Sequence, residues 1–223
     1  MVRNFDLVIF DCDGVLVDSE MLSARVLMGL MAEANLPITP AIFRSDFLGR
    51  SFAAAAGRAE ERFQHKLPDD FQFEYRRQLL TCMETELKPM PGIHDVLSAL
   101  SAPYCLATGS SPERLALSLR VTHLAPFFAG RAFTASEVQN GKPAPDLCFH
   151  AAIRMSCQPA RCLVIEDSEM GVRAAQSAGM QVWHFTGGAH IKAGYRLPSG
   201  LAANRVVADM RELKSALAEN GLC

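Results

Sequence analysis

The sequence of 223 residues lacks an excess of charge of either sign. It has 22 lysine and arginine residues against 24 aspartate and glutamate residues, and its formal net charge at pH 7 is −2. Proteins bind nucleic acids and anionic membrane surfaces through positively charged patches, and a chain with this charge balance has no excess of positive charge to attract either. We therefore expect no nucleic acid and no membrane as partners, but a small-molecule partner for a monomer or a weak homo-oligomer.

Long hydrophobic runs and cysteine pairs are also missing. No run approaches the roughly 20 apolar residues that span a bilayer, and no basic leader with a hydrophobic core precedes the first apolar run. The seven cysteines are odd in number, widely spaced and without a C-x-x-C pair. Several lie in apolar stretches, where a free thiol behaves as a small hydrophobic group. These absences predict reduced cysteines and a cytoplasmic location.

Short apolar runs alternate with helical patterns along most of the chain. This alternation is typical of strands that are buried on both faces of a parallel sheet. The hydrophobic content of 49% and a length above roughly 150 residues allow a good core and a second, smaller lobe. The expected strands are residues 7–10, 104–107, 162–165, 182–185 and 206–208, with a weaker one at 132–134.

Residues 16–87 break this alternation directly after the first expected strand. Their apolar spacing predicts consecutive helices over residues 19–34, around 52–65 and over 70–87, with prolines in the connections. An all-helical insert cannot pair with the strands it interrupts, so it should form a separate lobe. The predicted fold class is therefore α/β, with a core domain of residues 1–15 and 88–223 and a helical domain of residues 16–87.

Polar residues follow the expected strands at their carboxyl ends. In open parallel sheets ligands bind beyond these ends, so the residues there are candidates for a site. Taken alone, each has an ordinary structural explanation, such as a turn, a helix cap or an exposed loop lysine. Taken together, they bring carboxylates, hydroxyls and an amine into one crevice. The candidates are Asp11, Asp13, Thr108, Gly109, Glu166 and Asp167, with Lys142 before a later helix.

The charges of these candidates require a cation. The four carboxylates bring four negative charges into the crevice, and Lys142 returns only one. Mg²⁺ is favoured, because it binds oxygen ligands and is usually held by few protein carboxylates together with substrate phosphate and water. The hydroxyl and backbone N–H groups of Thr108 and Gly109, with Lys142, would cradle a phosphoryl group. Crowding also raises the pKa of one aspartate, which can then give a proton to a leaving alkoxide.

Four motifs of the sequence, in their composition and in their order along the chain, resemble those of the haloacid dehalogenase superfamily. The resemblance spans essentially the whole chain and is closest to the branch of phosphatases and phosphomutases with a cap inserted after the first strand. It implies a Rossmann-like parallel sheet core with an inserted α-helical cap domain. The motifs are Asp-Cys-Asp-Gly-Val-Leu-Val-Asp-Ser-Glu from Asp11, the strand-end Thr108, Lys142 in Gly-Lys-Pro-Ala-Pro-Asp, and Glu166-Asp167-Ser168 followed by Gly171, Ala174, Ala178 and Gly179.

The resemblance also implies a role for each motif residue. Asp11 would be the nucleophile that forms an aspartyl-phosphate, and Asp13 the acid that protonates the leaving oxygen and then activates water. Thr108, Gly109 and Lys142 would hold the phosphoryl oxygens. The implied Mg²⁺ ligands are Asp11, the backbone carbonyl of Asp13, Asp167, and Glu166 directly or through water.

The expected activity is hydrolysis of a small phosphate monoester, a sugar phosphate or a sugar-acid phosphate. Dehalogenases of the superfamily need neither magnesium nor an acid at the second position, so Asp13 argues against them. Mutases that resemble β-phosphoglucomutase carry a histidine where this chain has Ser23, which favours a phosphatase and leaves a phosphomutase as the alternative. A regulatory phospho-acceptor module is a remote alternative, because it would need neither Asp13 as an acid nor a helical cap.

Substrate choice is expected to depend on the cap. The loop of residues 47–51 resembles the family's cap loop, and Arg50 is predicted to bind a second anionic or hydroxyl-rich part of the substrate. Glu20, His190 and the pair Arg76 and Arg77 are weaker candidates for substrate contact, and we interpret them as cap-surface or loop residues. One departure from the family pattern is Gly109, where many relatives have Asn or Ala, so a side-chain contact to substrate is absent there.

Overall fold

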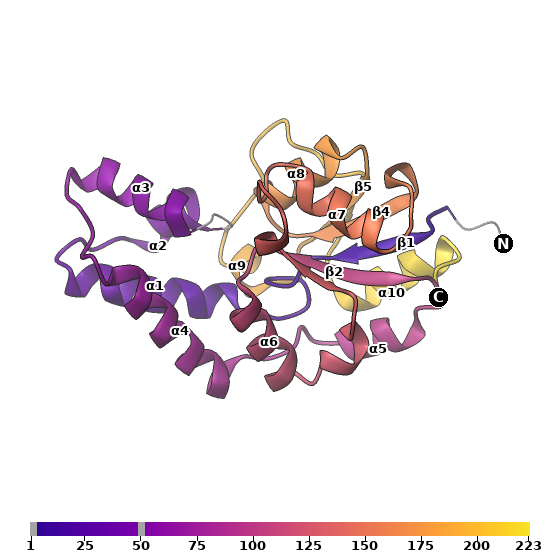
Figure 1. Ribbon diagram of the computed structural model, residues 1–223, viewed down its shortest axis with the longest axis horizontal. Helices are drawn as coiled ribbons and strands as arrows, with labels where there is room; N and C mark the ends of the chain where they lie inside the picture. Colours follow the sequence, from indigo (N-terminus) through magenta and orange to yellow (C-terminus); the bar gives the residue numbers. More distant parts are fainter. Residues whose placement is uncertain (1–3, 49–51) are drawn as a thin grey trace.

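The computed structural model describes residues 4–48 and 52–223, which contain a six-stranded sheet (Figure 1). All neighbouring strands are parallel, in the order β3-β2-β1-β4-β5-β6. The predicted α/β class and the six predicted strands are confirmed. The strands are β1 Leu7–Phe10, β2 Tyr104–Thr108, β3 Ala132–Thr134, β4 Cys162–Glu166, β5 Gln181–Phe185 and β6 Arg205–Val207.

The strand order brings the ends of three strands together. β1 lies between β2 and β4, and its last residue, Phe10, is opposite Leu106 on one side and Ile165 on the other. The connections run outward from β1 in both directions, so β1 and β4 flank the switch point at which open parallel sheets bind ligands. Asp11 therefore leaves the sheet beside the carboxyl ends of both neighbouring strands.

Helices cover both faces of the sheet and bury two apolar layers. Successive side chains of a strand point to opposite faces, so Leu7 and Ile9 belong to one layer while Val8 and Phe10 belong to the other. α7 and α8 cover the first layer, and α5, α6 and α10 cover the second. These helices, with the short α9, are α5 Ile93–Ala99, α6 Pro112–Val121, α7 Asp146–Arg154, α8 Glu169–Ser177, α9 Ala189–Lys192 and α10 Met210–Glu219.

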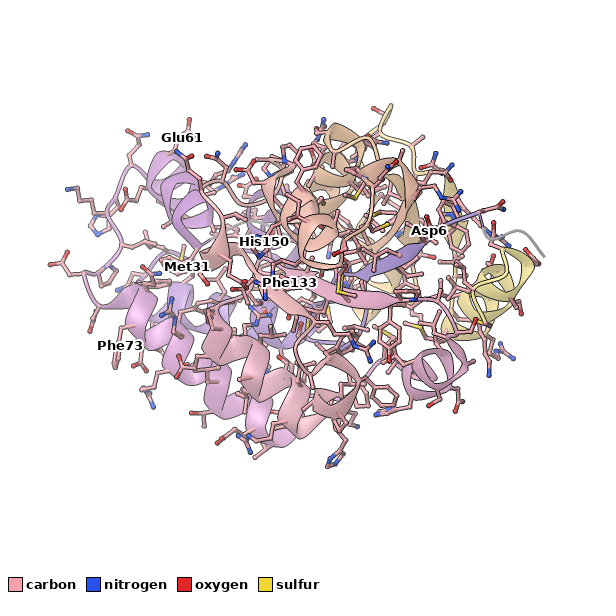
Figure 2. The ribbon with its side chains drawn as sticks, turned by 45° about the vertical axis from the view of Figure 1, so that its right-hand side comes forward. Asp6, Met31, Glu61, Phe73, Phe133 and His150 are labelled. Carbon is pink, nitrogen blue, oxygen red and sulfur yellow. The ribbon has the colours of Figure 1, made fainter. Side chains whose placement is uncertain are left out.

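The helices between β1 and α5, which we call the helical block, lie to one side of the sheet, at the left of Figure 1. They surround an apolar cluster of their own. Met31 is fully buried in this cluster, whereas Phe73 is 70% exposed and points outward (Figure 2). The three predicted helices are confirmed, but the π-helical turn was not predicted. The elements are α1 Glu20–Glu33, α2 Pro40–Ile42, the π-helical turn Phe43–Phe47, α3 Phe52–Phe63 and α4 Phe71–Glu86.

Two chain segments connect the helical block to the sheet, and they run side by side. Val17 forms an antiparallel bridge with Pro89. The backbone N–H of Met90 donates to the carbonyl oxygen of Leu16 at 2.8 Å. The first of these segments follows the carboxyl end of β1, so the block adjoins the edge of the sheet that carries the candidate residues.

The cysteines agree with the expectation drawn from composition. All seven cysteines are free, and Cys12 is buried in the same apolar layer as Phe10, as the alternation along the strand predicts. Within residues 4–48 and 52–223, no helix has both the length and the apolar character that a membrane crossing requires.

Candidate active site

Asp11 is the first residue beyond β1, and Lys142 joins it to β4. The Asp11 backbone N–H donates to the carbonyl oxygen of Ile165 at 3.0 Å, which extends the strand pairing to this residue. Lys142 Nζ lies 2.5 Å from Asp11 Oδ1 and 2.7 Å from Glu166 Oε1. The exposed fractions of the Asp11, Lys142 and Glu166 side chains are 10%, 12% and 1%. The structure thus brings Lys142 into the crevice in which the sequence places it.

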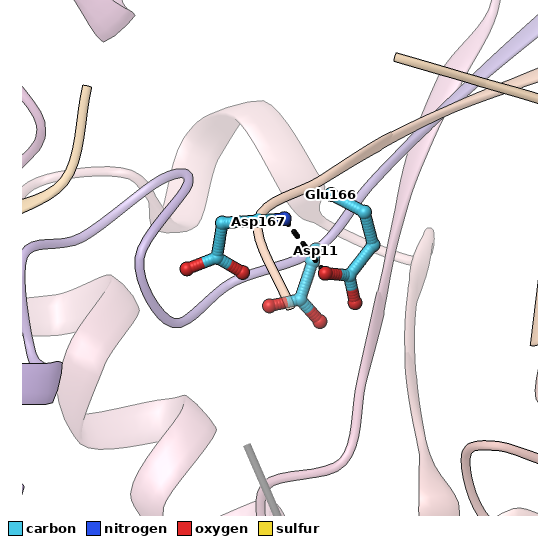
Figure 3. Close-up of side chains that lie close together, drawn as sticks. All are labelled: Asp11, Glu166 and Asp167. Atoms are coloured by element: carbon cyan, nitrogen blue, oxygen red, sulfur yellow. Dashed lines mark hydrogen bonds between the residues drawn. The ribbon is translucent and has the colours of Figure 1, made fainter. Parts of the chain in front are cut away.

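Asp11, Glu166 and Asp167 form a buried acidic cluster. One carboxylate oxygen from each residue lies within 4.8 Å of the others (Figure 3). Burial raises the pKa of Asp11 to about 7, against the opposing charge of Lys142. Burial, together with the charges of Glu166 and Asp11, raises the pKa of Asp167 well above its usual value. Lys142 and hydrogen bonds from Ser168 outweigh burial and lower the pKa of Glu166. Asp11 and Asp167 are therefore the two carboxylates that resist ionisation unless another positive charge is present.

The composition of this cluster fits a divalent cation. When all three carboxylates are ionised, three negative charges and the one positive charge of Lys142 leave −2. Carboxylate oxygens are hard ligands, which suit ions such as Mg²⁺. Gly14 has a φ of 80°, and a Cβ added there would lie 1.7 Å from Asp167 Oδ2. The Asp167 carboxylate therefore occupies space that any side chain at position 14 would fill, and only glycine leaves that space free.

Asp13 has a different set of neighbours from the acidic cluster. Its Oδ1 lies 2.7 Å from Arg114 Nη2 and accepts from Ser19 Oγ at 2.5 Å, while Oδ2 accepts from Ser110 Oγ at 2.5 Å. Burial alone would raise the pKa of Asp13. The Arg114 charge and the hydroxyl hydrogen bonds outweigh burial and hold this pKa below its usual value. Two aspartates that are two residues apart therefore face opposite electrostatic environments.

Arg114 was not predicted from the sequence, and Ser110 was noted only as part of the polar segment 108–111 that follows the second strand. Arg114 lies in the first turn of α6, and its backbone N–H donates to Oγ of Ser111, the N-cap residue. Ser111 therefore caps α6, so the helix-cap explanation for the polar residues after the second strand holds for this residue. Arg114 Nη2 also lies 3.4 Å from Ser19 Oγ and 3.3 Å from Ser23 Oγ. The sequence feature that could have indicated Arg114 is a basic residue in the first turn of the helix after β2, but the candidates were taken from the residues directly after each strand.

Thr108 and Gly109 lie at the carboxyl end of β2, where the sequence places them. Thr108 is buried, and its Oγ1 accepts from the backbone N–H of Ser110 at 3.1 Å. Gly109 is exposed, and an added Cβ would meet no heavy atom within 4 Å. A larger residue would therefore fit at this position, and glycine leaves the mouth of the crevice wider.

The interpretation of His190 as a loop residue was wrong. This histidine lies in α9, and its Nε2 is 3.0 Å from Asp167 Oδ2, with both side chains 3% exposed. Burial lowers the pKa of the imidazole to about 4, so the ring is neutral at pH 7. The segment after β5 folds back over the strand ends, and local sequence patterns do not reveal such a long-range contact.

A cavity of about 530 Å³ extends from these groups into the helical block. Glu20 and Arg76 line it, contrary to their interpretation as surface residues, whereas Arg77 pairs with Glu74 on the outside of α4. Burial raises the pKa of Glu20 to about 7. The predicted substrate residue Arg50 lies outside the described residues. Apolar side chains that the block contributes to the wall include Leu27, Met31, Phe43, Phe47, Phe52 and Phe71.

A family model and several known proteins are similar to this chain over most of its length. A family model for haloacid dehalogenase-like hydrolases matches residues 5–179. The 6-phosphogluconate phosphatase of Escherichia coli is 28% identical over 192 residues, which cover 86% of this chain and 87% of that protein. A conserved haloacid dehalogenase-like protein of unknown function from Agrobacterium tumefaciens is 33% identical, with a TM-score of 0.83 over 97% of this chain and 99% of its own. A HAD family hydrolase from Deinococcus radiodurans, solved with bound phosphate and sodium, is 32% identical, with a TM-score of 0.78 over 99% and 98% of the two chains.

These similarities extend over both the sheet and the helical block. The family model covers well over half of the chain, and both structures align along almost all of it, the sheet and the helical block included. The parallel sheet and the order of the four motifs are those that the resemblance implied. This chain therefore belongs to the haloacid dehalogenase-like hydrolase family.

Proposed function

We propose that this protein is a Mg²⁺-dependent phosphatase, which hydrolyses a sugar phosphate or sugar-acid phosphate through an aspartyl-phosphate. The observation that carries the proposal is the separation of the two aspartates: Asp11 lies beside Lys142 in the acidic cluster, whereas Asp13 pairs with Arg114. Lys142 and a bound cation would keep Asp11 ionised as a nucleophile, while the Asp13 carboxylate lies apart from them and would be left to handle the proton. The similar E. coli phosphatase and the phosphate-bound D. radiodurans hydrolase support this assignment.

Asp11 would supply the nucleophile. One of its carboxylate oxygens attacks phosphorus, and the bond between phosphorus and the leaving oxygen breaks. Lys142 Nζ, the Thr108 hydroxyl and the Gly109 N–H would hold the phosphoryl oxygens while negative charge shifts among them. Mg²⁺, when bound, would offset the negative charge of the phosphoryl group. The residues proposed to hold it are Asp11, Glu166, Asp167 and, through its backbone carbonyl, Asp13.

Asp13 would move the proton. It donates to the leaving oxygen in the first step, and in the second its carboxylate takes a proton from the water that attacks phosphorus. This second attack releases phosphate and restores Asp11. Arg114, Ser19 and Ser110 stabilise the charged form of Asp13, so at least one of these donors must give way before Asp13 holds a proton.

The helical block would act as the cap of this enzyme. The proposed boundaries of the cap, residues 16 and 87, lie next to the bridge between Val17 and Pro89, where the two connections meet. Arg50 would bind a second anionic or hydroxyl-rich part of the substrate. Ser23 stands where mutases carry a histidine, and the lack of that histidine favours a phosphatase over a mutase. Its Oγ accepts a hydrogen bond from Arg114 instead. Free thiols are consistent with a cytoplasmic enzyme.

A phosphate-release screen tests the proposal. Sugar phosphates, 6-phosphogluconate, phosphoglycolate and sugar bisphosphates are incubated with the protein, with Mg²⁺ or with a chelator. We expect Mg²⁺-dependent release that Asp11→Asn abolishes, while the matched change Asp95→Asn, at an exposed position of α5, leaves the rate unchanged. Undiminished release by Asp11→Asn would refute the nucleophile. An isomerised sugar phosphate in place of free phosphate, detected by phosphorus NMR, would establish a mutase instead.

A further inference from the structure

His190 is a buried polar group in an unusual environment. Its Nε2 lies 3.0 Å from Asp167 Oδ2, and both side chains are 3% exposed. Its Nδ1 is also buried and, among the described residues, has no hydrogen-bond partner. Leaving a buried polar atom unpaired is destabilising, so a histidine at such a position calls for an explanation.

The imidazole hydrogen of His190 belongs on Nε2, the nitrogen that faces Asp167 Oδ2, whenever Asp167 is ionised. A carboxylate only accepts hydrogen bonds, and a neutral imidazole carries one N–H. A hydrogen on Nδ1 would leave a buried donor unpaired and would set a nitrogen lone pair against a carboxylate oxygen. With its hydrogen on Nε2, the ring presents a positive edge to Oδ2 at 3.0 Å, which disfavours rotation of the carboxylate away from it. Its other oxygen remains available for a ligand.

Two glycines make room for the imidazole ring. A Cβ added to Gly188 would lie 2.7 Å from His190 Cε1 and 2.8 Å from Nδ1, and one added to Gly14 would lie 3.0 Å from Cε1. The backbone of Gly188, with φ −65° and ψ 148°, is a conformation that any residue adopts. The backbone conformation therefore does not require glycine at position 188. The nearby imidazole ring does, because it fills the space that a side chain would need. The ring is confined between these two backbone segments.

The segment that carries His190 is anchored to the core and to the helical block. Tyr195 Oη accepts from the backbone N–H of Glu169, two residues after Asp167, at 2.9 Å, and its ring centre lies 5.7 Å from that of His190. Ile191 packs into the apolar cluster of the helical block. α9 lies at the junction of the block and the sheet (Figure 1). These contacts keep the imidazole in one place relative to Asp167.

We propose that His190 is a positioning residue, which holds the Asp167 carboxylate in the orientation that binds a divalent cation. This role rests on the metal site of the proposed function. A second histidine fixes the main chain at the same residue, because His184 Nε2 donates to the Asp167 carbonyl oxygen at 3.1 Å. Metal ligands are commonly oriented by such partners, and loss of one typically lowers metal affinity about 10- to 100-fold.

The experiment measures Mg²⁺ binding by titration calorimetry, without substrate, on the full-length protein and its variants. We expect His190→Ala to raise the Kd for Mg²⁺ about 10- to 100-fold. His190→Gln should bring the Kd back toward the wild-type value, because the glutamine amide N–H reaches the position of Nε2. Gly188→Ala should weaken binding without removing a polar group, since the added methyl displaces the ring.

Matched controls separate positioning from folding. His150→Ala removes a histidine that pairs with Glu137 on the core, and Gly29→Ala adds a methyl where no heavy atom lies within 4 Å. Both should leave the Kd unchanged. A merely structural role for His190 would lower the melting temperature of its variants and leave the Kd unchanged.

The outcomes for His190 and for the metal site are distinguishable. If Asp167→Asn weakens saturable Mg²⁺ binding while both His190 variants and Gly188→Ala bind within twofold of wild type, the role of His190 is overturned and the metal site stands. If the wild-type protein shows no saturable binding, the metal site is overturned and the role of His190 with it. Should His190→Ala fail to fold, the glutamine variant and Gly188→Ala still decide between these outcomes.

Discussion

Among residues 4–48 and 52–223, Lys142 is the cation that lies against the acidic cluster, so removing its charge should destabilise the metal-free protein. Its Nζ contacts Asp11 and Glu166 at 2.5 and 2.7 Å, and the three side chains are at most 12% exposed. Lys142→Met keeps most of the volume and removes the charge. Breaking a buried ion pair by removing one partner costs about 3–5 kcal/mol, a large part of the about 5–15 kcal/mol that stabilises a typical protein.

The pH dependence of this loss follows from Asp11. Its pKa in the folded protein is raised to about 7, so between roughly pH 4 and 7 the folded state holds a proton that the unfolded state has lost. The stability that Asp11 contributes therefore falls as pH rises through that window. At about pH 5 Asp11 is protonated, and Lys142→Met loses mainly the pair with Glu166. The difference from wild type should therefore grow between about pH 5 and pH 8.

Urea unfolding in the presence of a chelator measures this difference. Lys88→Met, a change at an exposed lysine, is the control and should unfold like wild type. Mg²⁺ should stabilise the Lys142→Met protein at least as much as wild type, because the bound ion then faces less opposing charge. The reasoning is refuted if Lys142→Met and wild type have the same free energy of unfolding at about pH 8 within about 0.5 kcal/mol.

Three further predictions concern the proton donor, the metal site and the core. Asp13→Asn should bind phosphate but lose about 10²- to 10⁴-fold in kcat, and a near-normal kcat contradicts the acid–base role. Gly14→Ala should abolish Mg²⁺ binding in calorimetry, since its methyl would overlap Asp167 Oδ2; unchanged binding contradicts this packing. Phe128→Ala, at a side chain 2% exposed, should cost about 3–5 kcal/mol in urea unfolding, whereas Phe73→Ala at a 70% exposed position should cost about 0.5 kcal/mol or less.

The sheet could be predicted from the sequence because both of its faces are covered. Strands such as β1 and β4 therefore appear as uninterrupted apolar runs, bounded by polar residues at their carboxyl ends. The long helices of the block were predictable from their apolar spacing. The π-helical turn Phe43–Phe47 was not, because no residue pattern distinguishes it from an α-helical turn before the chain is packed.

The candidate site could be predicted where its residues follow strands. Asp11 and Glu166 lie at strand ends that the sheet order brings together, so the spacing of the apolar runs locates them. Arg114 lies in a helix, and its partner Asp13 is 101 residues away in the chain. His190 lies in a segment that returns after β5, and its partner Asp167 follows a different strand, β4. Their positions depend on tertiary packing, which a single sequence does not reveal.

The arrangement around Asp13 connects the proposed chemistry with the junction between the sheet and the block. Ser19 precedes α1 of the block, whereas Arg114 and Ser110 belong to the core, so donors from both sides hold the same carboxylate. All three favour its charged form, while a general acid must carry a proton. A substrate that inserts its leaving oxygen at this carboxylate must replace one of these donors. If the enzyme acts as proposed, Asp13 becomes an acid only once the substrate is in place, and the serine contributed from the block side links this change to the position of the cap.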